Sequence, residues 1–261
     1  MVRILMLMLA SLPLSCSVQM NPNPSFRKNV YQNDESDKEH LKNVTRYYKK
    51  LNLPCLSDIP KNEYDDYTKY VSDHTAYVIV HPAYYLFFHD NNRNKVVMDR
   101  KDDFSKNIVD LFIDSYPVDK DSKLQQMKVA LKNETRFLRE KALRNNLVIL
   151  VIPPIYWLHP SYPYKRYDEF ARYLNEVTNG SPSFIYVESE NFNTGYLSSS
   201  MLSRLDRFFS ATGVTKVKIG GEYLKKCVNN FYEQARQIEN IKNAALIPEI
   251  CAISPDALED N

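Results

Sequence analysis

The sequence predicts an α/β protein, a three-layer, doubly wound fold with a mainly parallel sheet between two layers of helices and an N-terminal extension. The first observation is a series of short, nearly continuous apolar runs, which are typical of strands buried on both faces. The second is that longer segments of helical periodicity separate these runs. Strands that alternate with helices form βαβ units, and such units give a parallel sheet.

Four apolar runs are predicted strands, and a fifth is weaker. Turn residues follow three of them, namely His81-Pro82, Pro153-Pro154 and Gly220-Gly221. Pro248 lies in the fifth run and places that strand at an edge of the sheet, because proline cannot donate to a strand ladder. The predicted strands are 76–80, 147–152, 184–187, 214–219 and 244–250. The predicted helices are 39–51, 104–113, 121–144, 167–177, 197–209 and 223–238.

Residues 1–16 have the pattern of a secretory signal peptide. Arg3 precedes an apolar run, 4–14, that is too short to span a bilayer. With Cys16 at its end, the segment resembles a bacterial lipoprotein signal, although Pro13 stands where that motif prefers leucine. The resemblance implies export and a lipid on Cys16 that anchors the chain to a membrane of the cell envelope. Simple secretion and an uncleaved start are the alternatives.

Composition and charge indicate which partners the protein can bind and how the chain is divided. The net charge is +2 and no basic block stands out, so the sequence predicts no nucleic-acid partner. Residues 17–70 are predicted to be a flexible tether and a helical lead-in, and residues 71–261 the α/β domain. After export, the odd set of Cys55, Cys227 and Cys251 leaves at least one cysteine unpaired within the chain. The sequence leaves open whether Cys55 and Cys251 form a disulfide.

The candidate site lies between Gly213 and Val228. A strand, a glycine turn and a helix follow one another there, and Cys227 falls in or near the first turn of the helix. In open α/β sheets, ligands bind at the carboxyl ends of the strands. The positive end of the helix dipole and the neighbouring Lys225 and Lys226 favour the thiolate, which is the reactive form. The alternative is a small apolar residue that packs the start of the helix.

The stretch 202–228 resembles the isochorismatase-like cysteine hydrolases, a family that includes nicotinamidases and N-carbamoyl amidohydrolases. A helix ends at Thr212-Gly213-Val214, a valine-rich strand follows, and Gly221 stands six residues before Cys227. Counting the earlier strands, the resemblance covers about residues 70–255. It implies that Cys227 is the nucleophile at the start of a helix.

The departures from this family concern its chemistry. His81 stands where the family has the aspartate that deprotonates the cysteine, and Glu188-Ser189-Glu190 occupies the region of its lysine. The segment that in the family is linked to a cis peptide and the oxyanion site carries the bulky Tyr223 and Leu224. No cofactor is implied. No metal site is claimed either, because the aspartate and a second histidine of the nicotinamidase metal site are missing.

Three functions stay open. The favoured one is a catalytically degenerate member that acts as a binding or interaction module, because the family's aspartate and lysine are both missing. The second is hydrolysis of a small amide through a thioester on Cys227, with His81 as base and Glu188 or Glu190 orienting the imidazole. The third is an envelope protein that binds protein or carbohydrate through an aromatic loop, residues 156–167. A small molecule or a protein could occupy either the pocket at Cys227 or this loop.

Overall fold

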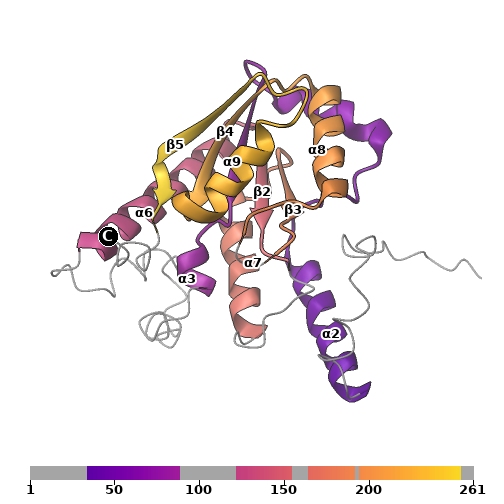
Figure 1. Ribbon diagram of the computed structural model, residues 1–261. Helices are drawn as coiled ribbons and strands as arrows, with labels where there is room; N and C mark the ends of the chain where they lie inside the picture. Colours follow the sequence, from indigo (N-terminus) through magenta and orange to yellow (C-terminus); the bar gives the residue numbers. More distant parts are fainter. Residues whose placement is uncertain (1–33, 89–121, 155–163, 192–193, 254–261) are drawn as a thin grey trace, which may run out of the picture.

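The computed structural model describes residues 34–88, 122–154, 164–191 and 194–253. Five strands form one parallel sheet in the order β3-β2-β1-β4-β5, which does not close into a barrel (Figure 1). The strands are β1 (Thr75–Val80), β2 (Val148–Ile152), β3 (Phe184–Glu188), β4 (Lys216–Glu222) and β5 (Asn243–Ala252). The predicted parallel sheet is therefore confirmed.

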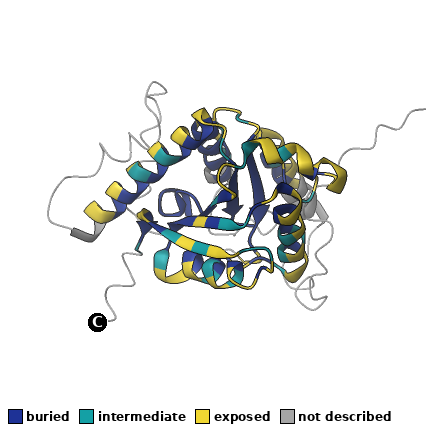
Figure 2. Cartoon of the chain, turned by 90° about the horizontal axis from the view of Figure 1, so that it is seen from above, coloured by how far each residue is buried: buried dark blue, intermediate teal, exposed yellow. Residues whose placement is uncertain are grey.

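Helices cover both faces of this sheet, so the predicted three-layer α/β/α arrangement is also confirmed. One face packs against α2 (Asp34–Lys50), α3 (Tyr84–Phe88), α6 (Ser122–Leu143) and α7 (Tyr164–Thr178). The other face packs against η1 (Lys61–Tyr70), α8 (Ser199–Thr212), η3 (Leu224–Val228) and α9 (Asn229–Ala235). Figure 2 shows most of the sheet as a buried layer, with exposed residues on the outward sides of the helices and on the edge strand β5.

Strand β2, which lies between β3 and β1, shows why the sequence folds into these layers. All its residues are buried, and successive side chains point to opposite faces of the sheet. Leu150 and Ile152 join the core beneath α6 and α7, whereas Ile149 and Val151 join the core beneath α8 and α9. A strand with two buried faces needs apolar residues at every position, and this explains the unbroken apolar run in the sequence.

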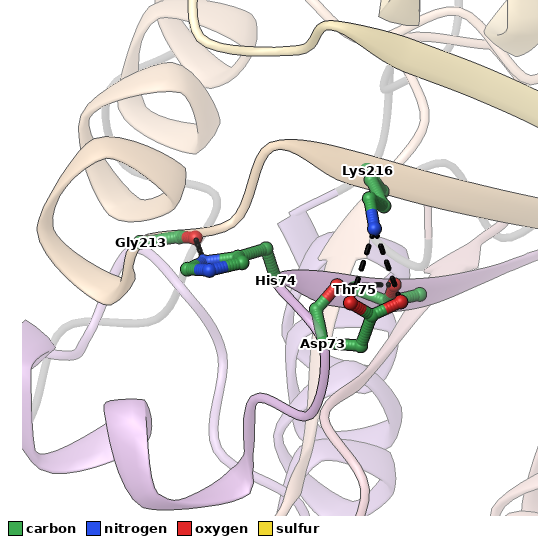
Figure 3. Close-up of polar contacts among 5 residues, drawn as sticks. All are labelled: Asp73, His74, Thr75, Gly213 and Lys216. Carbon is green, nitrogen blue, oxygen red and sulfur yellow. Dashed lines mark hydrogen bonds and ion pairs between the residues drawn. The ribbon is translucent and has the colours of Figure 1, made fainter.

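A polar cluster joins the amino ends of β1 and β4 (Figure 3). Lys216 Nζ lies 3.1 and 3.0 Å from the two carboxylate oxygens of Asp73, and the Thr75 hydroxyl donates to the Asp73 carbonyl oxygen at 3.0 Å. His74 Nδ1 lies 3.0 Å from the carbonyl oxygen of Gly213, which ends α8. These contacts position the start of β1 beside the start of β4, far from the candidate site at the carboxyl ends.

The bounds of β4 and the form of the helix that follows it differ from the prediction. β4 begins at Lys216 and not at Val214, because the Val214 N–H still donates to the α8 carbonyl of Phe209 at 2.9 Å. Gly213, with φ 72°, makes this helix end possible. The predicted helix 223–238 is a π-helical turn, η3, followed by α9, which ends at Ala235.

The described segment before β1 packs against the rest of the domain. α2 begins at Asp34, inside the predicted tether, and Tyr47 of this helix and Leu51 just after it are buried in the core that α7 also lines. Farther on, the Leu56 N–H donates to the Tyr186 carbonyl oxygen at 2.9 Å, which adds a short backbone pairing beside β3. Apolar side chains recur through this segment, and their burial attaches it to the sheet.

Several sequence predictions lie outside the described residues. These are the signal peptide 1–16 with its lipidation site Cys16, the first half of the tether, and the predicted helix 104–113. Within the part of the chain that the structure covers, no helix combines the length and the apolarity that crossing a membrane requires.

Candidate functional site

The carboxyl ends of β1 and β4 meet at the centre of the sheet. β2 and β3 lie on one side of β1, and β4 and β5 lie on its other side. The strand order therefore reverses between β1 and β4. Ligands of open α/β folds bind at such a reversal point. Val80 pairs with Gly221, which brings His81 after β1 and Glu222 at the end of β4 to the same edge. A side chain at Gly221, with φ 116°, would collide with the Val80 carbonyl.

Cys227 is placed near this edge, in η3, but its sulfur is buried. The residue is 3% exposed and belongs to the apolar core beneath α8 and α9. Burial raises the pKa of the Cys227 thiol to about 11, and backbone hydrogen bonds and the charge of Lys226 oppose this only in part. The prediction that the start of the helix and its lysines produce a thiolate is therefore wrong, because desolvation of the sulfur outweighs both effects.

A loop after β3 packs against the backbone of Cys227. Gly195 lies so close that an added Cβ would stand 2.5 Å from the Cys227 carbonyl oxygen. The Asn230 side chain donates to the Thr194 carbonyl oxygen at 2.8 Å. Gln234 forms two hydrogen bonds with the backbone of Leu197, at 2.8 and 2.9 Å. Side chains of α9 thus hold this loop over the turn that carries the thiol.

His81 is fully buried and directed to β3. Its Nε2 lies 3.0 Å from Ser189 Oγ. The serine hydroxyl has acceptors in the carbonyl oxygens of Asn191, at 2.8 Å, and Ile152, at 3.2 Å, so its oxygen accepts from the His81 Nε2–H. Nδ1 is then an acceptor, and it has no hydrogen-bond partner in the described structure. Burial lowers the pKa of His81 to about 3, which keeps the imidazole neutral.

The structure does not assemble the predicted Cys-His-Glu arrangement. His81 makes its hydrogen bond to Ser189 and stacks on Tyr84, with the ring centroids 5.4 Å apart. Glu188, which is 3% exposed, accepts from the Tyr48 hydroxyl of α2 at 2.5 Å. Glu190, the other candidate for orienting the imidazole, is exposed. The three predicted catalytic residues therefore have different partners: His81 contacts Ser189, Glu188 contacts Tyr48, and Cys227 lies in an apolar core.

The predicted oxyanion segment likewise uses its groups in contacts within the protein. The peptide bond between Glu222 and Tyr223 is cis. The Tyr223 ring is buried edge-on against Tyr84, with the centroids 5.7 Å apart, and Leu224 begins η3. The N–H groups of Lys226 and Val228 both donate to the Tyr223 carbonyl oxygen, at 3.0 and 3.2 Å. These two backbone donors are thus committed within the turn and do not form an oxyanion hole.

Two buried glutamates that the sequence analysis missed lie at the same edge. Glu222 Oε2 accepts from the Tyr85 N–H at 2.5 Å. Glu134 Oε1, from α6, accepts from the Ala83 N–H at 3.0 Å and from the Tyr173 hydroxyl at 3.3 Å. Each of these two residues is 1% exposed, and the second oxygen of its carboxyl has no hydrogen-bond partner among the described residues.

The environment of these carboxyls favours their protonated forms. Burial raises the pKa of Glu222 to about 8. Burial, reinforced by the charge of Glu222, raises the pKa of Glu134 well above its usual range. The sequence did carry a signal for Glu134, because it continues the apolar stripe Met127, Leu131, Leu138 at helical spacing. An acid on the buried face of a predicted helix marks an unusual environment.

The sequence analysis also considered a Cys55–Cys251 disulfide and an aromatic binding loop, and only part of that loop lies within the described residues. Cys55 is disulfide-bonded, Cys227 titrates as a thiol and Cys251 is free, so Cys55 and Cys251 do not pair. Most of the aromatic loop 156–167 lies outside the described residues. Its last member, Tyr167, is buried and packs edge-on against Tyr47, so it does not belong to a binding face. Among the side chains that the structure places, no group of three or more histidine, cysteine or acidic residues could hold a metal ion.

No protein-family model matches this chain, and no curated protein matches it.

Proposed function

We propose that the protein is a divergent isochorismatase-like protein that has lost hydrolase chemistry and acts as a binding or interaction module. One observation carries the proposal: Cys227 is 3% exposed and its thiol pKa is raised to about 11. At neutral pH, a thiol with this pKa is ionised in roughly one molecule in ten thousand. The nucleophile that the hydrolase chemistry needs is therefore both sealed and protonated.

His81 does not compensate for the protonated thiol. A histidine that takes the thiol proton must have a pKa near that of its partner or near the working pH. Burial lowers the pKa of His81 to about 3, whereas burial raises that of Cys227 to about 11. Moving the proton from sulfur to imidazole would then cost on the order of 10 kcal/mol. A base this weak, hydrogen-bonded to Ser189, supports a structural role for His81.

The isochorismatase-like assignment rests on the placement of Cys227. The parallel order β3-β2-β1-β4-β5 brings β1 and β4 together at the centre, and Cys227 follows the end of β4 after a cis peptide bond. The resemblance implies both features for the nucleophile of that family. Export, the expectation from residues 1–16, is supported by Cys55, because disulfides persist in oxidising compartments. We retain the lipid anchor on Cys16 in the cell envelope as part of the proposal.

Alkylation of Cys227 by iodoacetamide tests the loss of chemistry. We expect a rate that climbs with pH beyond the usual thiol range, with no plateau near neutrality, and the same profile in His81→Asn. Cys227→Ala supplies the background that comes from Cys251. A Cys227-dependent plateau near neutral pH that His81→Asn abolishes, or turnover of a small primary amide that Cys227→Ala removes, would refute the proposal.

The binding role has its own test in the aromatic residues of the loop 156–167. We expect Trp157→Ala and Tyr162→Ala to weaken chemical cross-linking of the exported protein to its envelope partner, because aromatic side chains contribute much of the energy of interfaces. Cys227→Ala should leave cross-linking intact. The opposite pattern would place the partner at the carboxyl ends of the strands and not at the aromatic loop.

A further inference from the structure

Glu134 and Glu222 reach the same short piece of chain from two different elements. Glu134 comes from α6 and binds the Ala83 N–H at 3.0 Å, and Glu222 comes from the end of β4 and binds the Tyr85 N–H at 2.5 Å. These two donors lie at the start of α3, directly after His81. Each carboxyl uses one oxygen for the backbone, and its second oxygen is buried with no hydrogen-bond partner in the described structure.

No positive charge faces this pair in the described structure. The neighbouring titratable groups are Tyr173 of α7, which donates to Glu134, Cys227 of η3, Cys251 of β5 and His81 after β1. At neutral pH both thiols and the imidazole are uncharged, because burial raises the thiol pKa values to about 11 and lowers that of His81 to about 3. Two ionised carboxylates without a cation would be a costly arrangement in this interior.

We propose that Glu134 and Glu222 share a proton as one carboxyl pair, and that this proton holds the turn between β1 and α3 against α6 and β4. When the proton leaves to solvent, two carboxylates face one another in the core, and the carboxyl end of the central strands loosens. The pair is thus a pH-sensitive clamp, which protonation closes and alkaline conditions open. A shared proton is the usual solution when two buried carboxyls interact strongly.

The direction of the pH dependence follows from the pKa shifts. An unfolded glutamate loses its proton near pH 4.5, whereas burial raises the pKa of Glu222 to about 8 and that of Glu134 well above its usual range. The folded state therefore binds more protons, so the stability contributed below pH 4.5 is lost as the pH rises through about 8. His81 acts in the opposite direction, but only below its usual pKa of 6.5, because above it the imidazole is neutral in both states.

Chemical denaturation between about pH 6.5 and 8 isolates the pair. For the wild type we expect the folding equilibrium constant to fall about tenfold per pH unit for each retained proton. Glu222→Gln and Glu134→Gln should each reduce this slope, because one carboxyl can no longer take part, and the double variant should abolish it. Glu140→Gln, an exposed position on the same helix that pairs with Arg144, should keep the wild-type slope.

Infrared spectroscopy of the folded wild type gives a second readout that needs no variant. We expect the absorption of a protonated carboxyl at neutral pH, which disappears at alkaline pH. Glu222→Gln should shift or remove this absorption. A wild-type stability that does not fall across the window, or the absence of a protonated carboxyl at neutral pH, would overturn the proposal. If the glutamine variants do not fold, these two wild-type measurements still decide it.

Discussion

Burial and helix dipole act against each other on Cys227, and their magnitudes decide the outcome. A charge at a helix start gains about 0.3–1 kcal/mol from the dipole. Raising the thiol pKa from 9.0 to about 11, as burial does here, corresponds to about 3 kcal/mol in favour of the protonated form. The π-helical turn η3 supplies too little to compensate. A cysteine at a helix start is therefore reactive only where water or a cation also reaches the sulfur.

Gly195 provides a test of the close packing over Cys227. We predict that Gly195→Ala lowers the free energy of unfolding by about 2–3 kcal/mol, because φ is +67° and the new Cβ would lie 2.5 Å from the Cys227 carbonyl oxygen. The matched control is Gly180→Ala, with φ +65° and no atom within 4 Å of the added Cβ, which should cost only about 1 kcal/mol. Denaturant titration measures both. Equal losses would show that backbone strain, and not contact with Cys227, limits this position.

At the scale of elements, the sequence predicts the strands, because a local run of apolar residues is enough to identify a buried strand. The runs that became β1, β2 and β3 are apolar at nearly every position, so their type follows from the residues alone. The π-helical turn η3 was not predicted, because it depends on how the chain leaves β4 after the buried Glu222. Likewise, the partner of His81 could not be predicted, because Ser189 lies 108 residues away at the end of another strand.

The loop after β3 is held by α9 and packs against the backbone of Cys227, so we expect its attachment to affect access to the thiol. We predict that Gln234→Ala lowers the free energy of unfolding by about 1–2 kcal/mol, because both backbone groups of Leu197 lose their side-chain partner. Cys227 should then react severalfold faster with iodoacetamide at alkaline pH. Gln237→Ala removes an equivalent side chain from an exposed position nearby and should leave both quantities unchanged. An unaltered alkylation rate in Gln234→Ala would mean that this loop does not shield the sulfur.

At the scale of the whole molecule, the fold follows from the order of elements, but the site does not. The parallel sheet and its two helical layers were predicted from alternating strands and helices. The rule for strand ends placed the candidate site at the carboxyl edge of the sheet. The pairing of β1 with β4 there was not predicted. Which side chains gather there depends on packing from other elements, and the chain fills the edge with Tyr84, Tyr223 and two buried acids, Glu134 and Glu222. The position of a site at the carboxyl edge of the sheet therefore does not predict which side chains form it.

The disulfide of Cys55, in the segment before β1, bears on whether the protein is exported, because disulfides persist in oxidising compartments. A cysteine holds either a thioether-linked lipid or a disulfide on its sulfur, so the partner of Cys55 bears directly on the anchor expected at Cys16. We predict that reduction of the protein lowers the free energy of unfolding by about 2–4 kcal/mol, because it releases a constraint on the unfolded chain. Cys55→Ser should not respond to reductant. Peptide mapping without reduction then identifies the partner: a bridge to Cys16 would exclude the lipid, whereas a lipidated Cys16 would require a partner from another chain.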